Sequence, residues 1–212
     1  MMRSTSSSFH RGFTLLELVV VGGLIAVLAG MGAIALWAHQ PSQSVELAQR
    51  TLVAALHAAR TQAQAHGREV ALAANTTAET GAPLRRLTLL VRDESAPSGW
   101  RSVGASVRLP AGTMIVPPSD LVVPEISFES EWPVELRSTV DVNSASLPNG
   151  YHGIAQFSPT PSGASVGLIY VAPTRREGAG WRLVSPSRSR AVAVSVYGVI
   201  SSVSEEDEGG GS

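Results

Sequence analysis

Apolar and polar positions follow three successive patterns along the chain, and the first is an almost continuous apolar segment. Residues 13–38 contain a single charged side chain, that of Glu17. A helix of this length, at about 1.5 Å per residue, slightly exceeds a hydrocarbon core about 30 Å thick. The pattern therefore predicts a transmembrane helix over residues 13–38.

The second pattern is helical and amphipathic. In residues 39–67 the apolar positions recur every three or four residues, as on one face of a helix. The stripe consists of Val45, Ala48, Leu52, Leu56, Ala59 and Ala63. Pro41 has no amide hydrogen, so we expect it to kink or interrupt the junction with the apolar segment. Gly67 is expected to end the helix, because glycine readily adopts the left-handed conformation found there.

The third pattern, over residues 68–203, is typical of a β-domain. Short runs rich in Val, Ile, Leu and Thr alternate with turns rich in Pro, Gly and Ser. The expected strands are EVALAAN, RRLTLLVR, EISFES, VELRSTVDV, GIAQFS, VGLIYVA and RAVAVSVYGVI. Residues 204–212, with four consecutive acids, are predicted to be a disordered tail. The predicted fold class is α+β, with a long N-terminal helix packed on a mostly antiparallel β-sheet domain.

Composition limits the chemistry that the chain can perform. Its 212 residues are enough for one soluble domain with a core beside the apolar segment. The chain has no cysteine, which excludes disulfides, thiolate metal sites and a cysteine nucleophile. Its formal net charge is −1, so charge alone indicates no polyanionic partner.

Glu17 raises the question of why a carboxylate lies near the start of an apolar helix. An ionisable group at membrane depth costs several kcal/mol unless it is paired or neutralised, so Glu17 either stays hydrated at the interface or has a partner. The basic residues Arg3 and Arg11 precede the apolar segment and the next one is Arg50, which predicts a cytoplasmic N-terminus. A cleaved signal peptide is the alternative, although its apolar region usually spans about 7–15 residues and an acid inside it is unusual.

The residues around Glu17 resemble the processing signature of type IV pilins and type II secretion pseudopilins. A short polar leader ends in Arg11-Gly12, and Phe13 and Glu17 follow at set spacing on the edge of the apolar run. The resemblance implies that residues 1–12 are a cytoplasmic leader peptide, which a prepilin peptidase removes by cleavage between Gly12 and Phe13. It also implies N-methylation of Phe13 and pairing of Glu17 with the N-terminal amine of a neighbouring subunit. An ammonium and a carboxylate attract strongly in low dielectric, so this pair would supply the partner of Glu17.

Three later segments resemble the GspH/FimT group of minor pseudopilins. LVAALHAARTQAQAHGREVAL resembles the end of the group's long helix, with Arg60 and Gly67 in matching places. IAQFSPTPSGASVGLIYV resembles its Phe-x-Pro-x-Gly hairpin, with Phe157, Pro159 and Gly163 in looser spacing. VAVSVYGVI resembles its last strand.

The resemblance implies a pilin-like fold and a structural role, not an enzyme. The chain would be a minor pseudopilin of a type II secretion system, spanning the bacterial inner membrane once, with its β-domain (68–203) in the periplasm. Its partners would be the prepilin peptidase, other major and minor pseudopilins or pilins, and the inner membrane. A minor type IV pilin (FimT/FimU-like), involved in pilus assembly or DNA uptake, is the alternative.

An enzymatic interpretation begins from Gly163-Ala164-Ser165-Val166-Gly167, which matches the G-x-S-x-G pattern of a hydrolase nucleophile elbow. In that fold the histidine follows the serine in sequence, whereas the last histidine here is His152. The elbow also leads into a helix, but the residues after Gly167 predict a strand. We therefore interpret the segment as a hairpin turn and expect no catalytic residue.

We expect neither a metal site nor a cofactor. His57 and His66 lie on opposite faces of the predicted helix. Asp120, Glu125 and Asp141 lie near predicted loops, but their spacing is not that of a calcium-binding loop.

Nucleic acid is the remaining candidate partner. All 16 basic residues are arginine, which suits bidentate phosphate contacts. Small clusters occur at Arg85-Arg86, Arg175-Arg176 and Arg188/Arg190. The chain nevertheless ends in VYGVISSVSEEDE and GGGS, and the acidic run would repel phosphate. Nucleic acid is therefore not expected as a partner.

Overall fold

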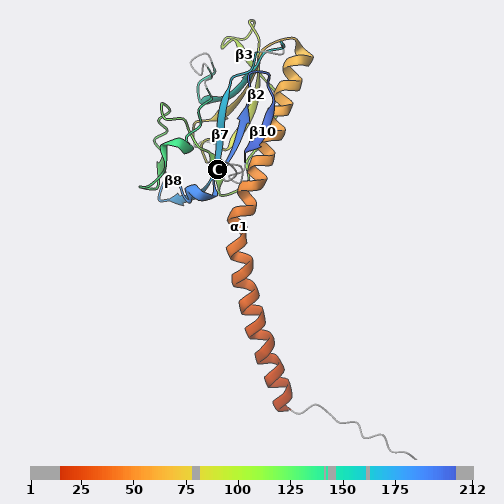
Figure 1. Ribbon diagram of the computed structural model, residues 1–212, viewed down its shortest axis with the longest axis vertical. Coiled ribbons are helices and arrows are strands. Elements are labelled where there is room, and N and C mark those ends of the chain that lie inside the picture. Colours follow the sequence, from red (N-terminus) through yellow and green to blue (C-terminus); the bar gives the residue numbers. More distant parts are fainter. Residues whose placement is uncertain (1–14, 78–81, 141, 143–146, 161–162, 204–212) are drawn as a thin grey trace, which may run out of the picture. The chain divides into compact units, whose positions relative to one another are not determined.

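The computed structural model describes residues 15–77, 82–140, 142, 147–160 and 163–203; the side chains of residues 15–18 and 25–42 lie outside this description. The chain divides into two compact units, residues 1–40 and residues 41–212. Helix α1 (Leu15–His66) contributes to both units, and each unit is considered by itself (Figure 1).

The second unit contains ten strands and two short 3₁₀ helices among its described residues. The strands are β1 (Val70–Asn75), β2 (Arg86–Arg92), β3 (Trp100–Arg108), β4 (Thr113–Ile115), β5 (Ile126–Phe128), β6 (Tyr151–Phe157), β7 (Gly167–Glu177), β8 (Gly180–Leu183), β9 (Arg190–Val194) and β10 (Ile200–Val203). The 3₁₀ helices are η2 (Val134–Leu136) and η4 (Pro186–Arg188).

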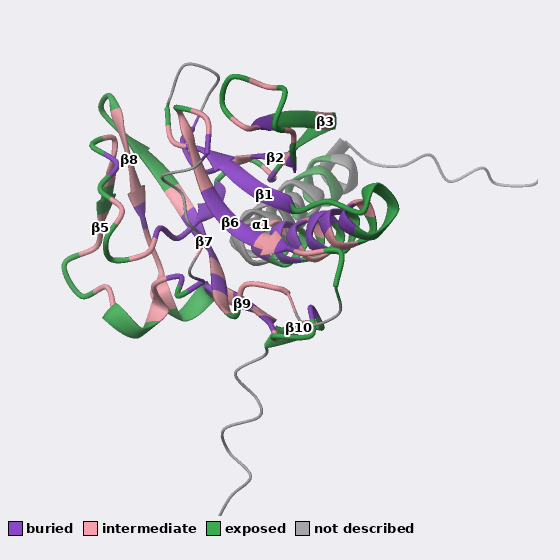
Figure 2. Ribbon diagram, turned by 90° about the horizontal axis from the view of Figure 1, so that it is seen from above, coloured by how far each residue is buried: buried purple, intermediate pink, exposed green. Residues whose placement is uncertain are grey.

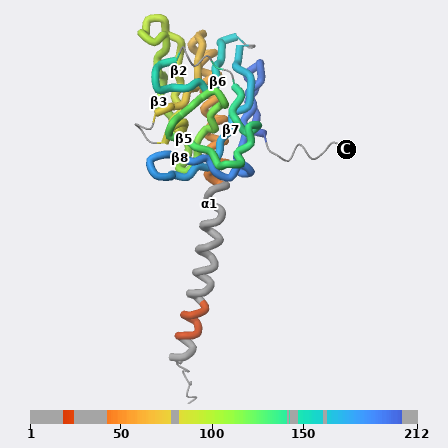
Figure 3. Tube along the Cα trace, turned by 90° about the vertical axis from the view of Figure 1, so that its left-hand side faces the viewer, coloured from red at the N-terminus to blue at the C-terminus, as the bar shows by residue number. Residues whose placement is uncertain are grey.

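The strands form two sheets. One has the order β3-β2-β1-β6, and the other has the order β10-β9-β7-β8-β5, with β4 pairing to β7. The pairings are antiparallel except that of β5 with β8, which lie side by side as a parallel pair (Figure 3). The prediction of a mostly antiparallel α+β domain is confirmed.

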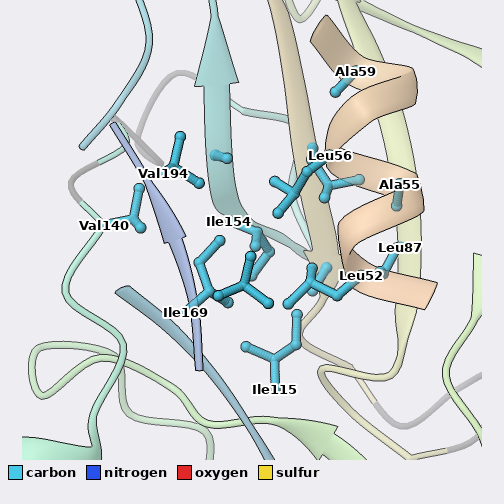
Figure 4. Packing of buried hydrophobic residues seen from close by; sticks show 14 of the residues in the cluster. Leu52, Ala55, Leu56, Ala59, Leu87, Ile115, Val140, Ile154, Ile169 and Val194 are labelled. Carbon is cyan, nitrogen blue, oxygen red and sulfur yellow. The ribbon is translucent and has the colours of Figure 1, made fainter. Parts of the chain in front are cut away.

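The second half of α1 packs its apolar stripe against both sheets. All six predicted stripe positions are buried. All of them except Val45 belong to one cluster with residues of β1, β2, β6, β7 and β9 (Figure 4). In Figure 2 the buried residues of this half of α1 lie on its side toward the sheets. Burial of one face is what stabilises the helix here, since an amphipathic helix gains most of its stability from tertiary packing.

The ends and the interior of α1 partly differ from expectation. Gly67 follows the last helical residue with φ = +59°, as predicted. The helix is not interrupted at Pro41. The predicted interruption is therefore wrong, although proline lacks one backbone hydrogen-bond donor; the expected kink at Pro41 stays a prediction. Within the part of the chain that the structure describes, no helix is long and apolar enough to cross a membrane.

Two predicted strands are wrong, and three observed strands were not predicted. The described residues of VELRSTVDV form η2 and irregular chain, because Pro133 precedes η2 and the Ser138 hydroxyl donates to the Val116 carbonyl instead of a strand ladder. RAVAVSVYGVI is two strands, β9 and β10, joined by a turn in which Gly198 has φ = +68°. Exposed β3 lacks an apolar alternation, and β4 and β8 are too short to show one.

Candidate functional site

The predicted processing and assembly residues are the first candidates. Gly12 and Phe13 lie outside the described residues. Glu17 lies in α1, but its side chain is also outside the description. Cleavage, methylation and pairing at these positions therefore stay predictions.

A second candidate is a junction that unites the three segments with GspH/FimT-like sequence. Arg60 of α1, Phe157 and Gly163 of the β6–β7 hairpin, and Gly198 of the β9–β10 turn line one shallow hollow. Its other lining residues are Gln64, Ser158, Thr160, Ala164 and Tyr197. Segments as far apart in sequence as Arg60 and Gly198, which are 138 positions apart, thus meet at one place.

A hydrogen bond between Arg60 and Gly198 ties the helix to the turn. The Nη1 atom of Arg60 donates to the Gly198 carbonyl oxygen over 2.9 Å. A Cβ atom on Gly198 would lie 3.3 Å from Arg60 Nε, and the φ of +68° at Gly198 is strained for other residues. Glycine at this position therefore permits both the turn and the close approach of the guanidinium.

The hairpin between β6 and β7 is held by short polar contacts. The Ser158 amide donates to the Gly163 carbonyl over 2.6 Å, and Phe157 forms an antiparallel bridge with Ala164. The Ser165 hydroxyl accepts a hydrogen bond from the Gln156 amide over 2.6 Å and donates to the Gln156 carbonyl over 3.1 Å. The G-x-S-x-G segment leads into β7, so the predicted hairpin turn is confirmed and Ser165 stabilises that turn.

Exposed apolar side chains occur in the segments that reach the hollow, and of these Tyr197 lines it. Val196, Tyr197 and Val199 of the β9–β10 turn are exposed, as is Val166 before β7. Val166 precedes Gly167, which pairs with Val194 at the end of β9. Sequence reasoning missed Tyr197 and Gly198, because an unbroken strand was expected there; a glycine inside a strand pattern was the available signal.

The histidines and loop acids do not assemble into a cluster in the described parts of the chain, where no three His, Asp or Glu side chains could hold a metal ion. His57 and His66 are exposed on α1. Burial lowers the pKa of His152, and the Asp120 carboxylate partly opposes this shift. Asp141 lies outside the described residues.

The first arginine cluster lies in the four-stranded sheet. Arg86 pairs with Arg108 across β2 and β3, and Arg85 donates from Nε to the Leu109 carbonyl over 2.8 Å. Burial, and next the nearby Arg108 charge, lower the pKa of Arg85. Fixing Arg85 on a backbone carbonyl reduces its freedom to follow a phosphate backbone.

The other arginine clusters lie in or beside the six-stranded sheet. Arg175 pairs with Arg182 across β7 and β8, and Arg182 forms an ion pair with Glu177 over 2.7 Å. Arg190 pairs with Val171 and donates from Nη1 to the Ser189 carbonyl. The clusters predicted from sequence are thus divided between two sheets.

No family model and no curated protein matches the sequence. A solved structure of the minor pseudopilin EpsH from the type 2 secretion system of Vibrio cholerae is similar, with 11% identity and a TM-score of 0.45, covering 77% of this chain and 98% of that one. A second structure of EpsH from the same organism has 13% identity and a TM-score of 0.44, covering 76% of this chain and 94% of that one.

Proposed function

We propose that the chain is a minor pseudopilin, a structural subunit of a type II secretion pseudopilus. The observation that carries the proposal is the junction of Arg60 with Gly198. Three segments resembled the same protein group separately, and the fold brings residues of all three to one hollow. If the three resemblances to the protein group were accidental, there would be no reason for the three segments to meet in the folded chain.

The proposed role begins with maturation at the inner membrane. The leader of residues 1–12 is removed after Gly12, and the amine of Phe13 is methylated. The apolar helix of residues 13–38 stores the subunit in the membrane until a filament extracts it. During extraction the Glu17 carboxylate pairs with the N-terminal amine of a neighbour, because either charge alone is costly in an apolar bundle.

The periplasmic domain must follow its helix when the filament grows. The buried stripe of α1 and the Arg60–Gly198 hydrogen bond join helix and sheets into one packed unit over residues 41–203. A force on the helix is therefore transmitted to the domain through the packed core, because close-packed protein interiors resist deformation.

Intact mass tests the maturation step. The full chain is recovered from membranes of cells with a prepilin peptidase and of matched cells without one. In cells with the peptidase we expect the mass of a chain that begins at methylated Phe13, and in cells without it the full-length mass. The Gly12→Val variant should keep the full-length mass in both strains. Cleavage near Ala35, or an uncut chain in both strains, would contradict the proposal.

Assembly is tested with Glu17→Gln, which removes the charge and nearly keeps the shape. We expect normal leader removal, because the change lies beyond the cleavage site. Recovery in sheared filaments should fall strongly, because the neighbour's amine loses its partner. Filament recovery equal to that of the unmodified chain would refute the pairing.

The alternative of a minor type IV pilin shares these maturation steps and differs in its contacts. A role in DNA uptake requires retention of the full chain on immobilised duplex DNA, falling steeply with salt. The acidic run of residues 205–208 opposes such retention. Retention that Arg176→Gln, a change at an exposed position, abolishes would favour the pilin alternative.

A further inference from the structure

Two hydrogen bonds give the direction of β9 relative to the packed half of α1. Gln49 donates from Nε2 to the Ala191 carbonyl at the start of β9 over 2.8 Å, and Arg60 donates to the Gly198 carbonyl in the turn after β9. Strand β9 therefore begins beside Gln49 and runs in the direction of α1. Strand β7 is antiparallel to β9, so its last residues extend past Gln49 toward the end of the domain at which α1 enters it.

The hairpin of β7 and β8 carries two exposed arginines beyond this point. Val171 of β7 pairs with Arg190 at the start of β9, and Arg175 and Arg176 follow Val171 by four and five residues. At about 3.3 Å per strand residue, they lie about 13–17 Å past the start of β9. The hairpin thus projects from the domain on the side where α1 enters.

The chain that joins the domain to the apolar segment covers a similar length. The apolar segment ends at Ala38, eleven positions before Gln49. Eleven residues span about 16 Å as a helix. A membrane that holds residues 13–38 would therefore have its surface about as far beyond Gln49 as the hairpin arginines extend.

The arginines of this end keep their positive charge available. Arg175, Arg176 and Arg188 of η4 are exposed, and none of them forms an ion pair with a carboxylate in the described residues. The acid of the hairpin, Glu177, is engaged by Arg182 over 2.7 Å. Free guanidinium groups are suited to bidentate contacts with phosphate oxygens.

Acidic side chains also occur at this end, on the segment after β5. Glu129 is engaged, since its Oε2 atom accepts a backbone amide hydrogen bond at the start of η4 over 3.2 Å. Glu131 and Glu135 are exposed, but the segment that carries them returns to β7, where the Tyr170 amide donates to the Ser138 hydroxyl over 3.2 Å. The unpaired positive charge is therefore concentrated on the hairpin and η4.

A tryptophan accompanies the hairpin arginines. Trp181 of β8 is half-buried and is the cross-strand partner of Arg176. Tryptophan is enriched at membrane–water interfaces, where its amphipathic ring lies at the depth of the headgroups. Duplex DNA offers phosphates as well, but it has no such interface for an indole ring, so the pair favours a lipid surface.

We propose that the β7–β8 hairpin rests on the anionic lipid surface of the membrane that anchors the chain, with Arg175, Arg176 and Arg188 against headgroup phosphates. That residues 13–38 form this anchor rests on the function proposed above. The contact holds the domain against the membrane before assembly, and extraction of the subunit into a filament breaks it.

The test uses the absence of cysteine, because one introduced thiol can then carry a fluorophore at a chosen place. Ala179→Cys labels the exposed tip of the hairpin, and Ala65→Cys labels the exposed far end of α1. Each full chain is reconstituted in vesicles of phosphatidylcholine, or of phosphatidylcholine and phosphatidylglycerol in equal parts, with a trace of lipid that carries a quencher on its headgroup. We expect phosphatidylglycerol to increase quenching at position 179 and not at position 65. The increase should fall with added salt.

A double variant assigns the effect to the hairpin. Arg175→Gln with Arg176→Gln should lower the ratio of docked to undocked hairpin about 25-fold, because each basic residue near an anionic surface favours binding about fivefold. The matched control is Arg68→Gln with Arg101→Gln, which removes the same charge beside Asp93 at the opposite end of the domain. The control should quench as the unmodified chain does. Equal unfolding temperatures check that both double variants are folded.

The outcomes separate this inference from the proposed function. Flotation with both vesicle types but equal quenching at position 179, or equal losses for the two double variants, would overturn the inference alone. Flotation only with phosphatidylglycerol, lost in the hairpin variant, would overturn the membrane anchor and support the docking surface. Flotation with neither vesicle type would overturn both. Retention on duplex DNA that the hairpin variant loses, without a lipid effect, would assign the arginines to nucleic acid and overturn the inference.

Discussion

Leu52→Ala is the substitution whose effect follows most directly from the packing. The Leu52 side chain is 0% exposed and lies in the cluster that joins α1 to both sheets (Figure 4). The change removes three carbon groups, each worth about 0.8 kcal/mol on burial, or about 2.4 kcal/mol in total. The remaining cavity adds to this, and the slightly higher helix propensity of alanine returns about 0.2 kcal/mol. We expect the free energy of unfolding to fall by about 3 kcal/mol.

Urea unfolding of the full chain in non-ionic detergent, followed by tryptophan fluorescence, measures this loss. In a domain of this size about 3 kcal/mol also lowers the unfolding temperature by about 6–12 °C. Leu47→Ala is the matched control, because Leu47 lies on the same helix but is 55% exposed. It should cost less than about 0.5 kcal/mol. Equal losses at the two positions would refute the assignment of the buried stripe.

Two further predictions concern the turn at Gly198 and the pH dependence of stability. Gly198→Ala should lower the free energy of unfolding, measured in urea, by about 2 kcal/mol. The reason is that a residue with a Cβ is strained in the left-handed conformation and that this Cβ crowds Arg60. Gly178 has a similar φ of +59°, and a Cβ there would have no atom within 4 Å, so Gly178→Ala should lower the free energy of unfolding by only about 1 kcal/mol. Equal losses for the two variants would contradict the crowding at Arg60. Burial lowers the pKa of His152 below its usual value of about 6.5, so the unfolded chain binds the proton more readily. The free energy of unfolding should therefore fall as pH drops from about 7 through this range, and His152→Gln should flatten the fall; an unchanged pH slope would contradict it.

The helix was predictable because its signal is local. The six stripe positions share one face at a 3.6-residue period, and any sheet that buries this face buries all of them. Gly67 was predictable for the same reason, since glycine at a helix end has a local conformational advantage. The strands β1, β2 and β6 also agree with expectation, because their apolar runs are bounded by turn residues.

The errors occurred where a local pattern competed with a distant contact. VELRSTVDV is rich in residue types that favour strands, but Ser138 and Thr139 donate hydrogen bonds to the carbonyl groups of Val116 and Leu168, which are distant in sequence. β-propensity mainly describes the fit to a pleated, half-buried surface, and such a surface exists only after the sheet forms.

For the candidate site, the sequence alone determined the types of groups that are available: an acid at the edge of an apolar run, no cysteine, and Arg60, Phe157 and Gly163 in segments that resemble one protein group. These features follow from short stretches of adjacent residues and from the amino-acid composition. Only the tertiary structure decided that Arg60 lies against Gly198 and that Tyr197 stands exposed beside it. The physical reason is that this contact spans 138 positions, and sheet pairing and core packing, not local preference, determine which distant residues meet.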